Sequence, residues 1–140
     1  EDFGKIVMPI DVVTSDNINF LNPNTKEISM VQSKDKILDI GAHTIKRYIE
    51  VINKSKSIFW NGPLGYVEKK PYDIGTIKLS QAIADSDTFS IVGGGDTIPI
   101  IESLRIQNKF TCLSTGGGSL LKFIEGKDLP ILSKLGVYNK

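Results

Sequence analysis

Two short segments of the chain each place three consecutive glycines after an apolar run: residues 90–97 read SIVGGGDT and residues 113–119 read LSTGGGS. Glycine lacks a Cβ atom, so the backbone can approach a ligand closely at these positions. A helix that begins directly after such a loop presents unpaired N–H groups and the positive end of its dipole. We therefore predict a phosphate-binding site at these two loops. Tight turns without a ligand are the alternative for either one.

Neither triplet matches the two common glycine-rich nucleotide motifs. The P-loop requires Gly-Lys-Ser/Thr after a four-residue gap, which neither segment has. The dinucleotide fingerprint requires glycine or alanine at its sixth position, where this sequence has Ile98 and Leu121. Asp96, which follows the first triplet, suits Mg²⁺, because this ion is usually held by one or two carboxylates together with nucleotide phosphates.

Alternating strand-like and helix-like segments position the glycines. The strands, which are short apolar runs, are predicted at residues 57–60, 88–92 and 110–114, and the helices at residues 42–55, 72–86, 96–107 and 119–127. This order predicts an α/β fold: a parallel sheet with helices on both faces, a three-layer αβα, Rossmann-like arrangement. Ligands bind beyond the carboxyl ends of parallel strands, where both triplets fall. Asp96 is the expected N-cap of its helix.

The first third of the chain is less regular. Residues 5–13, KIVMPIDVV, form an apolar run that predicts a strand buried on both faces, although Pro9 cannot donate to a β-ladder. Residues 14–33 are rich in Asn, Ser, Asp and Thr and predict a long connection with a small hairpin around NPNTKE. The segment ILDIG then leads into the helix predicted from residue 42.

Composition excludes several classes of function. The 140 residues, 40% of them hydrophobic, fit one globular domain. A net charge of +1 offers no electrostatic basis for binding nucleic acid or an anionic membrane, and no apolar run approaches the ~20 residues of a membrane span. The single cysteine, Cys112, excludes an internal disulfide and a cysteine-based zinc site, and we predict a buried thiol. No signal peptide is visible, so a cytoplasmic location is expected.

Five segments are similar, in order and spacing, to signature segments of the phosphoglycerate kinase family: KIVMPIDVV, LDIGAHT, FWNGPLGYVE, VGGGDT and STGGGSLLKFIEGKDLP. The resemblance covers roughly residues 5–130. It implies that residues 1–140 are the C-terminal portion of a nucleotide-binding domain, and that the domain for 3-phosphoglycerate is absent. A start without Met, directly before an apolar run, is also interpreted as a piece of a larger polypeptide. The implied parent enzyme is a monomer.

The resemblance implies a reaction and roles for individual residues. The reaction is reversible phosphoryl transfer between 1,3-bisphosphoglycerate and MgADP, giving 3-phosphoglycerate and ATP, with Mg²⁺ as cofactor. The residues implied for the nucleotide are Leu38, Gly41, Pro63, Tyr66 and Glu68 around base and ribose, and Asn61, Gly94, Gly95, Asp96 and Thr97 around the phosphates. Asp96 is the implied metal ligand, and the residues implied to face the phosphoryl group in transfer are Gly116, Gly117 and Gly118.

The sequence departs from the family pattern in three places. Residues 42–44 read Ala-His-Thr where the family usually has Pro-Lys-Thr, and we interpret His43 as a surface or capping residue rather than a general base. Residues 129–131 read Leu-Pro-Ile instead of Leu-Pro-Gly, which puts the geometry of the tail in doubt. Tyr66 replaces a smaller apolar residue, which puts the fit around ribose and base in doubt.

Alternatives stay open at this point. The isolated chain is expected to be inactive, since it holds no site for the second substrate. A non-catalytic nucleotide-binding module, or a binder of dinucleotides or nucleotide sugars, would share the same sheet. In a free fragment, we expect residues 5–13 to pair with residues 57–60, to swap into a dimer, or to leave the fragment marginally stable. In a larger assembly the strand would keep its family position with a gap beside it.

Overall fold

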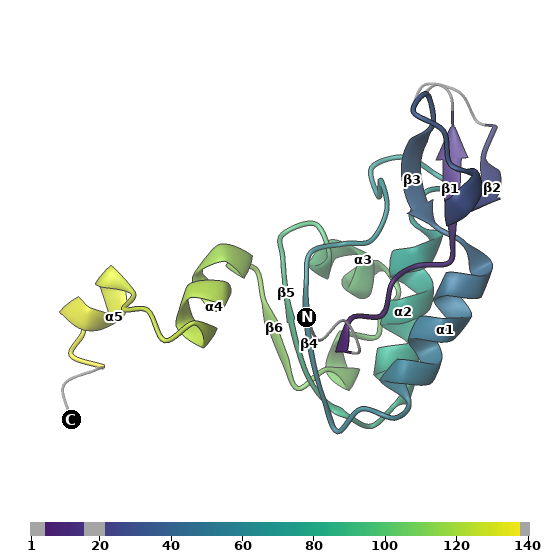
Figure 1. Ribbon diagram of the computed structural model, residues 1–140. Coiled ribbons are helices and arrows are strands. Elements are labelled where there is room, and N and C mark those ends of the chain that lie inside the picture. Colours follow the sequence, from purple (N-terminus) through teal and green to yellow (C-terminus); the bar gives the residue numbers. More distant parts are fainter. Residues whose placement is uncertain (1–4, 16–21, 138–140) are drawn as a thin grey trace.

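The computed structural model describes residues 5–15 and 22–137, which form two small sheets and the helices around them (Figure 1). In chain order the elements are β1 (Asp11–Ser15), β2 (Asn24–Glu27), η2 (Ile28–Met30), β3 (Lys36–Ile40), α1 (Ala42–Ile52), β4 (Ser57–Asn61), α2 (Ile74–Asp85), β5 (Phe89–Gly93), α3 (Ile98–Ser103), η3 (Gln107–Lys109), β6 (Cys112–Ser114), α4 (Gly117–Ile124) and α5 (Pro130–Lys134). The predicted alternation of strands and helices from residue 42 onward is confirmed.

The second sheet is parallel, in the order β4-β5-β6, as the sequence predicts. Figure 1 shows α1, α2 and α3 gathered on one side of it. On the other face, a Cβ atom added at Gly93 would meet Leu120, so α4 begins beside the end of β5, while Phe59 and Phe89 on this face are about half exposed. The α/β fold is therefore present, with three helices against one face of the sheet and α4 adjoining the other.

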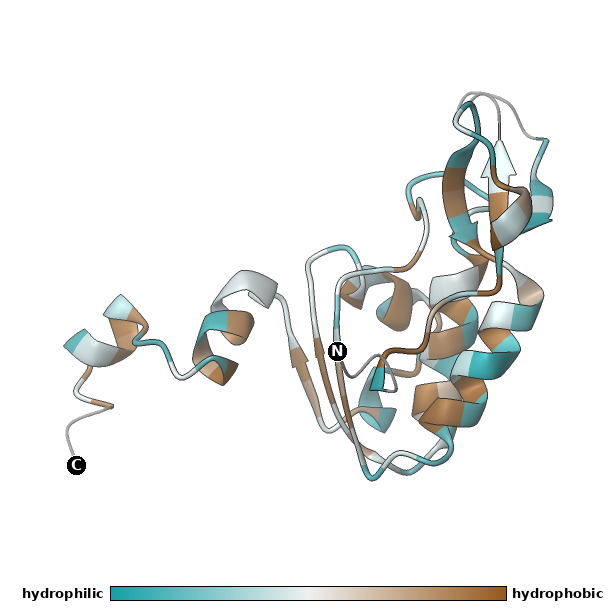
Figure 2. Ribbon diagram, in the orientation of Figure 1, coloured by the Kyte–Doolittle hydropathy of each residue, from teal (hydrophilic) through white to brown (hydrophobic). Residues whose placement is uncertain are grey.

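The core lies between the parallel sheet and helices α1 to α3. Its buried side chains include Val92 and Ile101, which are fully buried, together with Leu79 and Ile83 of α2. Trp60 at the end of β4 packs against this cluster, as expected for a strand aromatic. Figure 2 shows the apolar stripes of these helices turned toward the sheet. Burying one such side chain contributes about 1.5–3 kcal/mol to stability, so these contacts hold in place the strands from which the glycine loops extend.

The strand prediction for residues 5–13 is wrong in extent and in partner. The strand begins only at Asp11 and runs to Ser15, and it pairs antiparallel with both β2 and β3 in a separate sheet of order β2-β1-β3. Pro9 explains the late start, because it cannot donate to a ladder. The partner β2 falls within the NPNTKE segment, where a hairpin was expected.

Residues 5–10 lie along helix α1 and do not form a strand. The Tyr48 hydroxyl donates to the Val7 carbonyl at 3.0 Å, and the Ile10 amide donates to Thr44 Oγ1 at 3.0 Å. Among the described residues, β4 pairs only with β5. A cavity of about 350 Å³, lined on its sides by Val7 and Trp60, separates the two segments. Residues 5–10 therefore do not pair with β4, while a gap in the family position and the self-association of a free fragment stay predictions.

The Cys112 side chain is exposed, so the predicted buried thiol is wrong. The parallel register explains this, because Cys112 lies opposite Ile91 while the next residue, Leu113, lies opposite the fully buried Val92. Cys112 therefore faces away from the helices of the core. Within the described ranges, no helix has the length and apolarity needed to cross a membrane.

The C-terminal elements extend away from the body of the molecule (Figure 1). Helix α5 was not predicted, and it begins at Pro130, in the first turn where proline costs no hydrogen bond. The apolar side chains of Phe123, Ile131 and Leu135 are all more than half exposed.

Candidate functional site

The two glycine triplets meet at the carboxyl ends of β5 and β6. The Gly94 amide donates to the Ser114 carbonyl at 3.1 Å, and the Gly62 amide donates to the Gly93 carbonyl at 3.0 Å. Gly94 has φ +120°, a conformation that favours glycine. These bonds continue the parallel ladder past the strands, so three chain segments end side by side.

Asn61, the last residue of β4, lies between both loops. Its Oδ1 would be 2.6 Å from a Cβ atom at Gly93 and 2.7 Å from one at Gly117, closer than real Cβ contacts allow. A Cβ atom at Gly117 would also lie 3.0 Å from the Gly94 amide nitrogen. The glycines are therefore required for the approach of these segments. The grouping of Asn61 with Gly94 and Gly117, expected from the family resemblance, is present in the fold.

Thr97 carries the one unsatisfied group of this region. Its side chain is fully buried, and its Oγ1 is, within the described part of the chain, the buried side-chain polar atom without a hydrogen-bond partner. Such a group costs about 1–3 kcal/mol when left unpaired, which favours an acceptor or donor supplied by a ligand. A Cβ atom at Gly94 would lie 3.2 Å from this oxygen, so the hydroxyl faces the loop.

Asp96 is exposed in the turn before α3. The expectation that it caps this helix is wrong, because the N-cap is Thr97 and no side chain makes a capping bond. The described residues contain no cluster of three or more His, Cys, Asp or Glu side chains that could hold a metal ion. A single carboxylate fits Mg²⁺ only together with phosphate oxygens, since this ion is usually bound by one or two carboxylates plus substrate phosphates.

The other triplet starts helix α4. Gly116 is its N-cap, and Gly117 and Gly118 form its first turn. Gly117 is buried, whereas Gly118 is exposed and has open space where a Cβ would stand. Gly95 of the first triplet likewise has nothing within 4 Å of a Cβ position. Close packing thus explains Gly93 and Gly117 but leaves Gly95 and Gly118 without a packing reason.

Leu38 and Tyr66 line one cavity of about 500 Å³ between the antiparallel sheet and the loop after β4. Its walls are mostly apolar, and the side chains of Ile37 and Pro9 contribute to them. The Tyr66 amide donates to the Leu38 carbonyl at 2.7 Å, which holds the two sides together. Tyr66 is about one third exposed and forms part of the rim.

The remaining residues predicted for base and ribose do not line this cavity. Pro63 lines the separate cavity beside β4. Glu68 is exposed in the turns that precede α2. Gly41 is the N-cap of α1, where a Cβ atom would collide with the Asp11 carboxylate. The structure therefore gives Gly41 a packing role beside Asp11.

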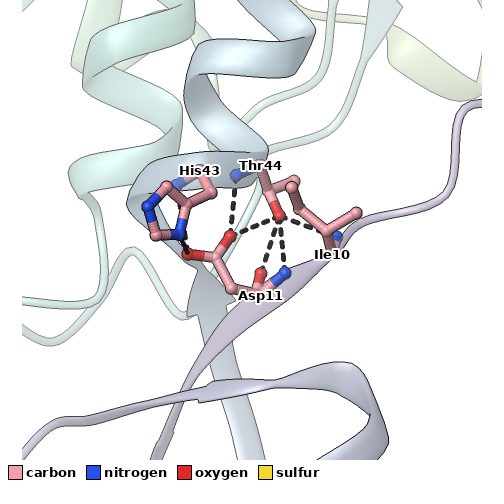
Figure 3. Close-up of polar contacts among 4 residues, drawn as sticks. All are labelled: Ile10, Asp11, His43 and Thr44. Carbon is pink, nitrogen blue, oxygen red and sulfur yellow. Dashed lines mark hydrogen bonds and ion pairs between the residues drawn. The ribbon is translucent and has the colours of Figure 1, made fainter.

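Two of the buried aspartates, Asp11 and Asp39, accept hydrogen bonds from the first turn of a helix and were missed by the sequence reasoning. Asp11 accepts hydrogen bonds from the Thr44 amide at 2.7 Å, the Thr44 hydroxyl at 2.6 Å and the His43 amide at 3.0 Å (Figure 3). Burial raises the pKa of Asp11, but these hydrogen bonds outweigh it and hold the pKa below its usual value. The His43 ring lies 3.3 Å from the same carboxylate and is mostly exposed, in agreement with a surface role.

Asp39 is the second buried aspartate, with an exposed fraction of 3%. Its carboxylate accepts from the Gly75 amide at 2.9 Å and from its neighbour Ile40 at 2.8 Å. Burial, with a smaller effect of the Asp73 carboxylate, raises the pKa of Asp39 to about 6 against the donated hydrogen bonds. The signal available in the sequence was a single carboxylate inside each apolar segment, PIDVV and ILDIG, which requires a buried partner.

The fold and these loops define a class of α/β protein with a parallel sheet whose strands end in glycine-rich turns at one edge. The sequence model of the family described as Phosphoglycerate kinase matches residues 1–127. The chain belongs to the phosphoglycerate kinase family.

Curated relatives agree with this assignment. The chain is 46% identical over 134 residues to the phosphoglycerate kinase of Helicobacter pylori, a match that covers 94% of this chain and 33% of that protein. It is 40% identical over 136 residues to the phosphoglycerate kinase of Buchnera aphidicola from Schizaphis graminum, covering 96% of this chain and 35% of that protein. The chain thus spans about a third of the length of the relatives it matches.

Solved structures show the same fold. The phosphoglycerate kinase of Coxiella burnetii superposes with a TM-score of 0.80 at 36% identity, covering 86% of this chain and 32% of that chain. The enzyme of Pyrococcus horikoshii gives a TM-score of 0.80 at 31% identity, covering 96% of this chain and 34% of that chain.

Proposed function

We propose that this chain supplies the nucleotide site of a phosphoglycerate kinase, which transfers a phosphoryl group between 1,3-bisphosphoglycerate and MgADP. The observation that carries the proposal is the meeting of both glycine loops around Asn61, next to the unpaired hydroxyl of the buried Thr97. An anion placed there meets a hydrogen-bond donor and backbone that no Cβ atom shields.

The proposed roles follow from position. Gly94, Gly95 and Thr97 hold the nucleotide phosphates, with Asn61 approaching them from β4. Leu38 and Tyr66 enclose the base, since they line the apolar cavity of about 500 Å³. The residues proposed to complete the ribose and base contacts are Gly41, Pro63 and Glu68. Gly116, Gly117 and Gly118 face the phosphoryl group in transfer from the first turn of α4.

Mg²⁺ bound by Asp96 together with the nucleotide phosphates would neutralise charge on the transferred group. Such a transfer requires little covalent chemistry from the protein, so positioning and hydrogen-bond donors aimed at the phosphates supply the rate. No general base is needed in this scheme, which agrees with the surface position of His43.

We further propose that the isolated chain does not turn over substrate. It spans about a third of the length of the curated relatives it matches, and the family resemblance implies a 3-phosphoglycerate site outside these 140 residues. A non-catalytic nucleotide-binding module is the second candidate, favoured by the same observation. A coupled assay of ATP formation tests both the inactivity of the isolated chain and the non-catalytic module, because robust turnover by the chain alone contradicts each of them.

Calorimetric titration with ADP tests the nucleotide site. We expect weak binding that strengthens when Mg²⁺ is added, and loss of this Mg²⁺ dependence in Asp96→Ala. Thr97→Val keeps the side-chain shape but removes the unpaired hydroxyl, and should weaken MgADP binding about tenfold. Thr88→Val, in the residue directly before β5 and so at the far end of this strand from the glycine loop, is the control and should bind like the unmodified chain.

Equal ADP affinity with and without Mg²⁺ contradicts the role of Asp96. Equal affinity in the Thr97 and Thr88 variants contradicts the role of Thr97. Tighter binding of a dinucleotide than of MgADP would favour the dinucleotide-binding alternative instead.

A further inference from the structure

The loop of residues 63–66 joins β4 to the turns before α2 and carries Tyr66 on the rim of the candidate base cavity. Two sets of hydrogen bonds hold this loop. The hydroxyl of the fully buried Thr76 accepts from the Leu64 amide at 2.8 Å and donates to the Leu64 carbonyl at 2.5 Å. On the other side, the Tyr66 amide donates to the Leu38 carbonyl at 2.7 Å.

Between these attachments the loop rests on the Asp39 side chain. Gly65 has φ +81°, and a Cβ atom there would lie 2.6 Å from Asp39 Oδ1. A Cβ atom at Gly75 would collide with the same oxygen. The carboxyl group is therefore packed between the loop and the first turn of α2, where the Gly75 amide donates to it. Asp39 itself lies in the wall of the cavity that contains Leu38 and Tyr66.

We propose that Asp39 is a positioning residue of the candidate nucleotide pocket: its buried carboxyl group seats the loop of residues 63–66 against α2 and thereby sets the position of Tyr66. The assignment of the pocket to a nucleotide rests on the function proposed above. The evidence that Asp39 seats the loop is its packing at Gly65 and Gly75, and this seating can be measured without any ligand.

When the loop closes onto Asp39, the carboxylate of this residue takes up a proton. When the loop lifts, water reaches the carboxylate and the charged form is stabilised; when the loop closes, burial and the Asp73 carboxylate favour the neutral form. Besides Asp73, the other titratable side chains on the elements packed around Asp39 are Asp11 on β1, Lys36 on β3, Tyr66 on the loop, Glu68, Lys69, Lys70 and Tyr72 in the turns before α2, and Lys78 and Asp85 on α2. Because the closed form has a pKa of about 6 at Asp39, the closed loop gains population as the pH falls through this value.

Amide hydrogen exchange on the 140-residue chain tests this. After correction for the intrinsic exchange rate, protection of the Tyr66 amide should increase about tenfold from pH 7 to pH 5. The Thr44 amide in α1 is the internal reference for global unfolding, whose free energy also depends on Asp39, so Tyr66 should exchange faster than Thr44 at both pH values. Equal exchange free energies for the two amides at both pH values would indicate global unfolding instead and would overturn the proposal.

Three variants sharpen the result. Asp39→Asn should abolish the pH dependence of Tyr66 protection. Thr76→Val, which breaks the neighbouring attachment without removing an ionisable group, should lower Tyr66 protection at every pH and keep the tenfold slope. Asp73→Asn should move the midpoint to lower pH, because a negative neighbour is removed, and it serves if Asp39→Asn does not fold. The proposal is overturned if Tyr66 protection still depends on pH in Asp39→Asn, or if the pH midpoint of this dependence does not move in Asp73→Asn.

The nucleotide assignment is checked separately by titrating adenosine into the unmodified chain and into Asp39→Asn. We expect adenosine to bind at least threefold more tightly to Asp39→Asn than to the unmodified chain at pH 7, where only the unmodified chain carries a charge that opens the loop, and about equally to both at pH 5. Equal affinity at pH 7 overturns the link between Asp39 and the pocket. Absence of binding by the unmodified chain overturns the proposed function, while a tenfold slope at Tyr66 still supports the seating of the loop.

Discussion

Asp11 and Asp39 are both buried carboxylates that receive hydrogen bonds from the first turn of a helix, yet their pKa values move in opposite directions. Asp11 meets α1 and Asp39 meets α2. Each carboxylate also occupies the space that a Cβ atom would need at a neighbouring glycine: Gly41 for Asp11 and Gly75 for Asp39. The two sites thus share their local design and differ in what surrounds the carboxylate.

The difference lies in the donors and in the neighbouring charge. Asp11 accepts from a hydroxyl as well as two helix amides, and these bonds outweigh its burial. Asp39 accepts from the backbone amides of Gly75 and Ile40 and lies near Asp73, so burial prevails and the pKa rises to about 6. The comparison shows that a buried carboxylate at a helix start can either stabilise the fold as an ion or weaken it, depending on these partners.

The two sites therefore stabilise the fold in different pH ranges. The contribution of Asp11 is present above its unfolded pKa of 3.8 and is lost as the pH falls through its lowered folded value. The contribution of Asp39 is fully present below pH 3.8 and is lost as the pH rises through about 6.

The largest effect should come from removing the Asp11 carboxylate. Asp11→Ala leaves the Thr44 amide, the Thr44 hydroxyl and the His43 amide without their acceptor. We expect the free energy of unfolding in urea at pH 7 to fall by about 3 kcal/mol. Asp85→Ala, at the exposed end of α2, is the control and should change it by less than about 0.5 kcal/mol. Similar losses in both variants would show that the Asp11 bonds are not what holds α1.

Asp39→Asn should stabilise the fold at high pH, in contrast to the loss of stability expected for Asp11→Ala. Its unfolding free energy, measured relative to the unmodified chain, should rise by about 2–3 kcal/mol between pH 4 and pH 8, because only the unmodified chain must keep a buried charge. Urea unfolding at half-unit pH intervals measures this. Parallel pH curves for the two chains would mean that Asp39 titrates normally and that the contrast with Asp11 is false.

Gly75→Ala tests the packing that both sites share. Replacing a helical glycine by alanine ordinarily stabilises a helix by up to about 1 kcal/mol. In α2 the added Cβ atom would collide with Asp39, so we expect a loss of about 1–2 kcal/mol in thermal unfolding. Gly118→Ala in α4, where the Cβ meets open space, is the matched control and should be neutral or stabilising. A gain in both variants would mean that Asp39 moves aside freely.

His43→Ala should have the smallest effect. The ring is mostly exposed and lies 3.3 Å from Asp11, whose hydrogen bonds come from the His43 amide and from Thr44. We expect a change below about 0.5 kcal/mol in the urea unfolding free energy at pH 7. A loss close to that of Asp11→Ala would show that the imidazole, and not the backbone, completes the Asp11 site.

The local elements and the positions of the glycine loops could be predicted from the amino-acid sequence. Apolar periodicity and strand runs depend on neighbouring residues, so helices α1 and α2 and strands β4 and β5 were predicted within a few residues of their observed ends. The glycine triplets marked the carboxyl ends of β5 and β6 correctly for the same reason. The strand predicted over residues 5–13 was wrong, because an apolar run alone does not reveal its partner strand.

The pairing of polar residues that act together could not be predicted from the sequence, because it depends on the folded chain. Asp11 meets Thr44 across 33 positions, and Asp39 meets Gly75 across 36. Each aspartate looked like an isolated polar interruption of a strand. The same holds for the exposure of Cys112, which followed from the register between β5 and β6. Burial, hydrogen bonds and pKa depend on contacts between distant segments, and such contacts exist only once hydrophobic packing has brought those segments together.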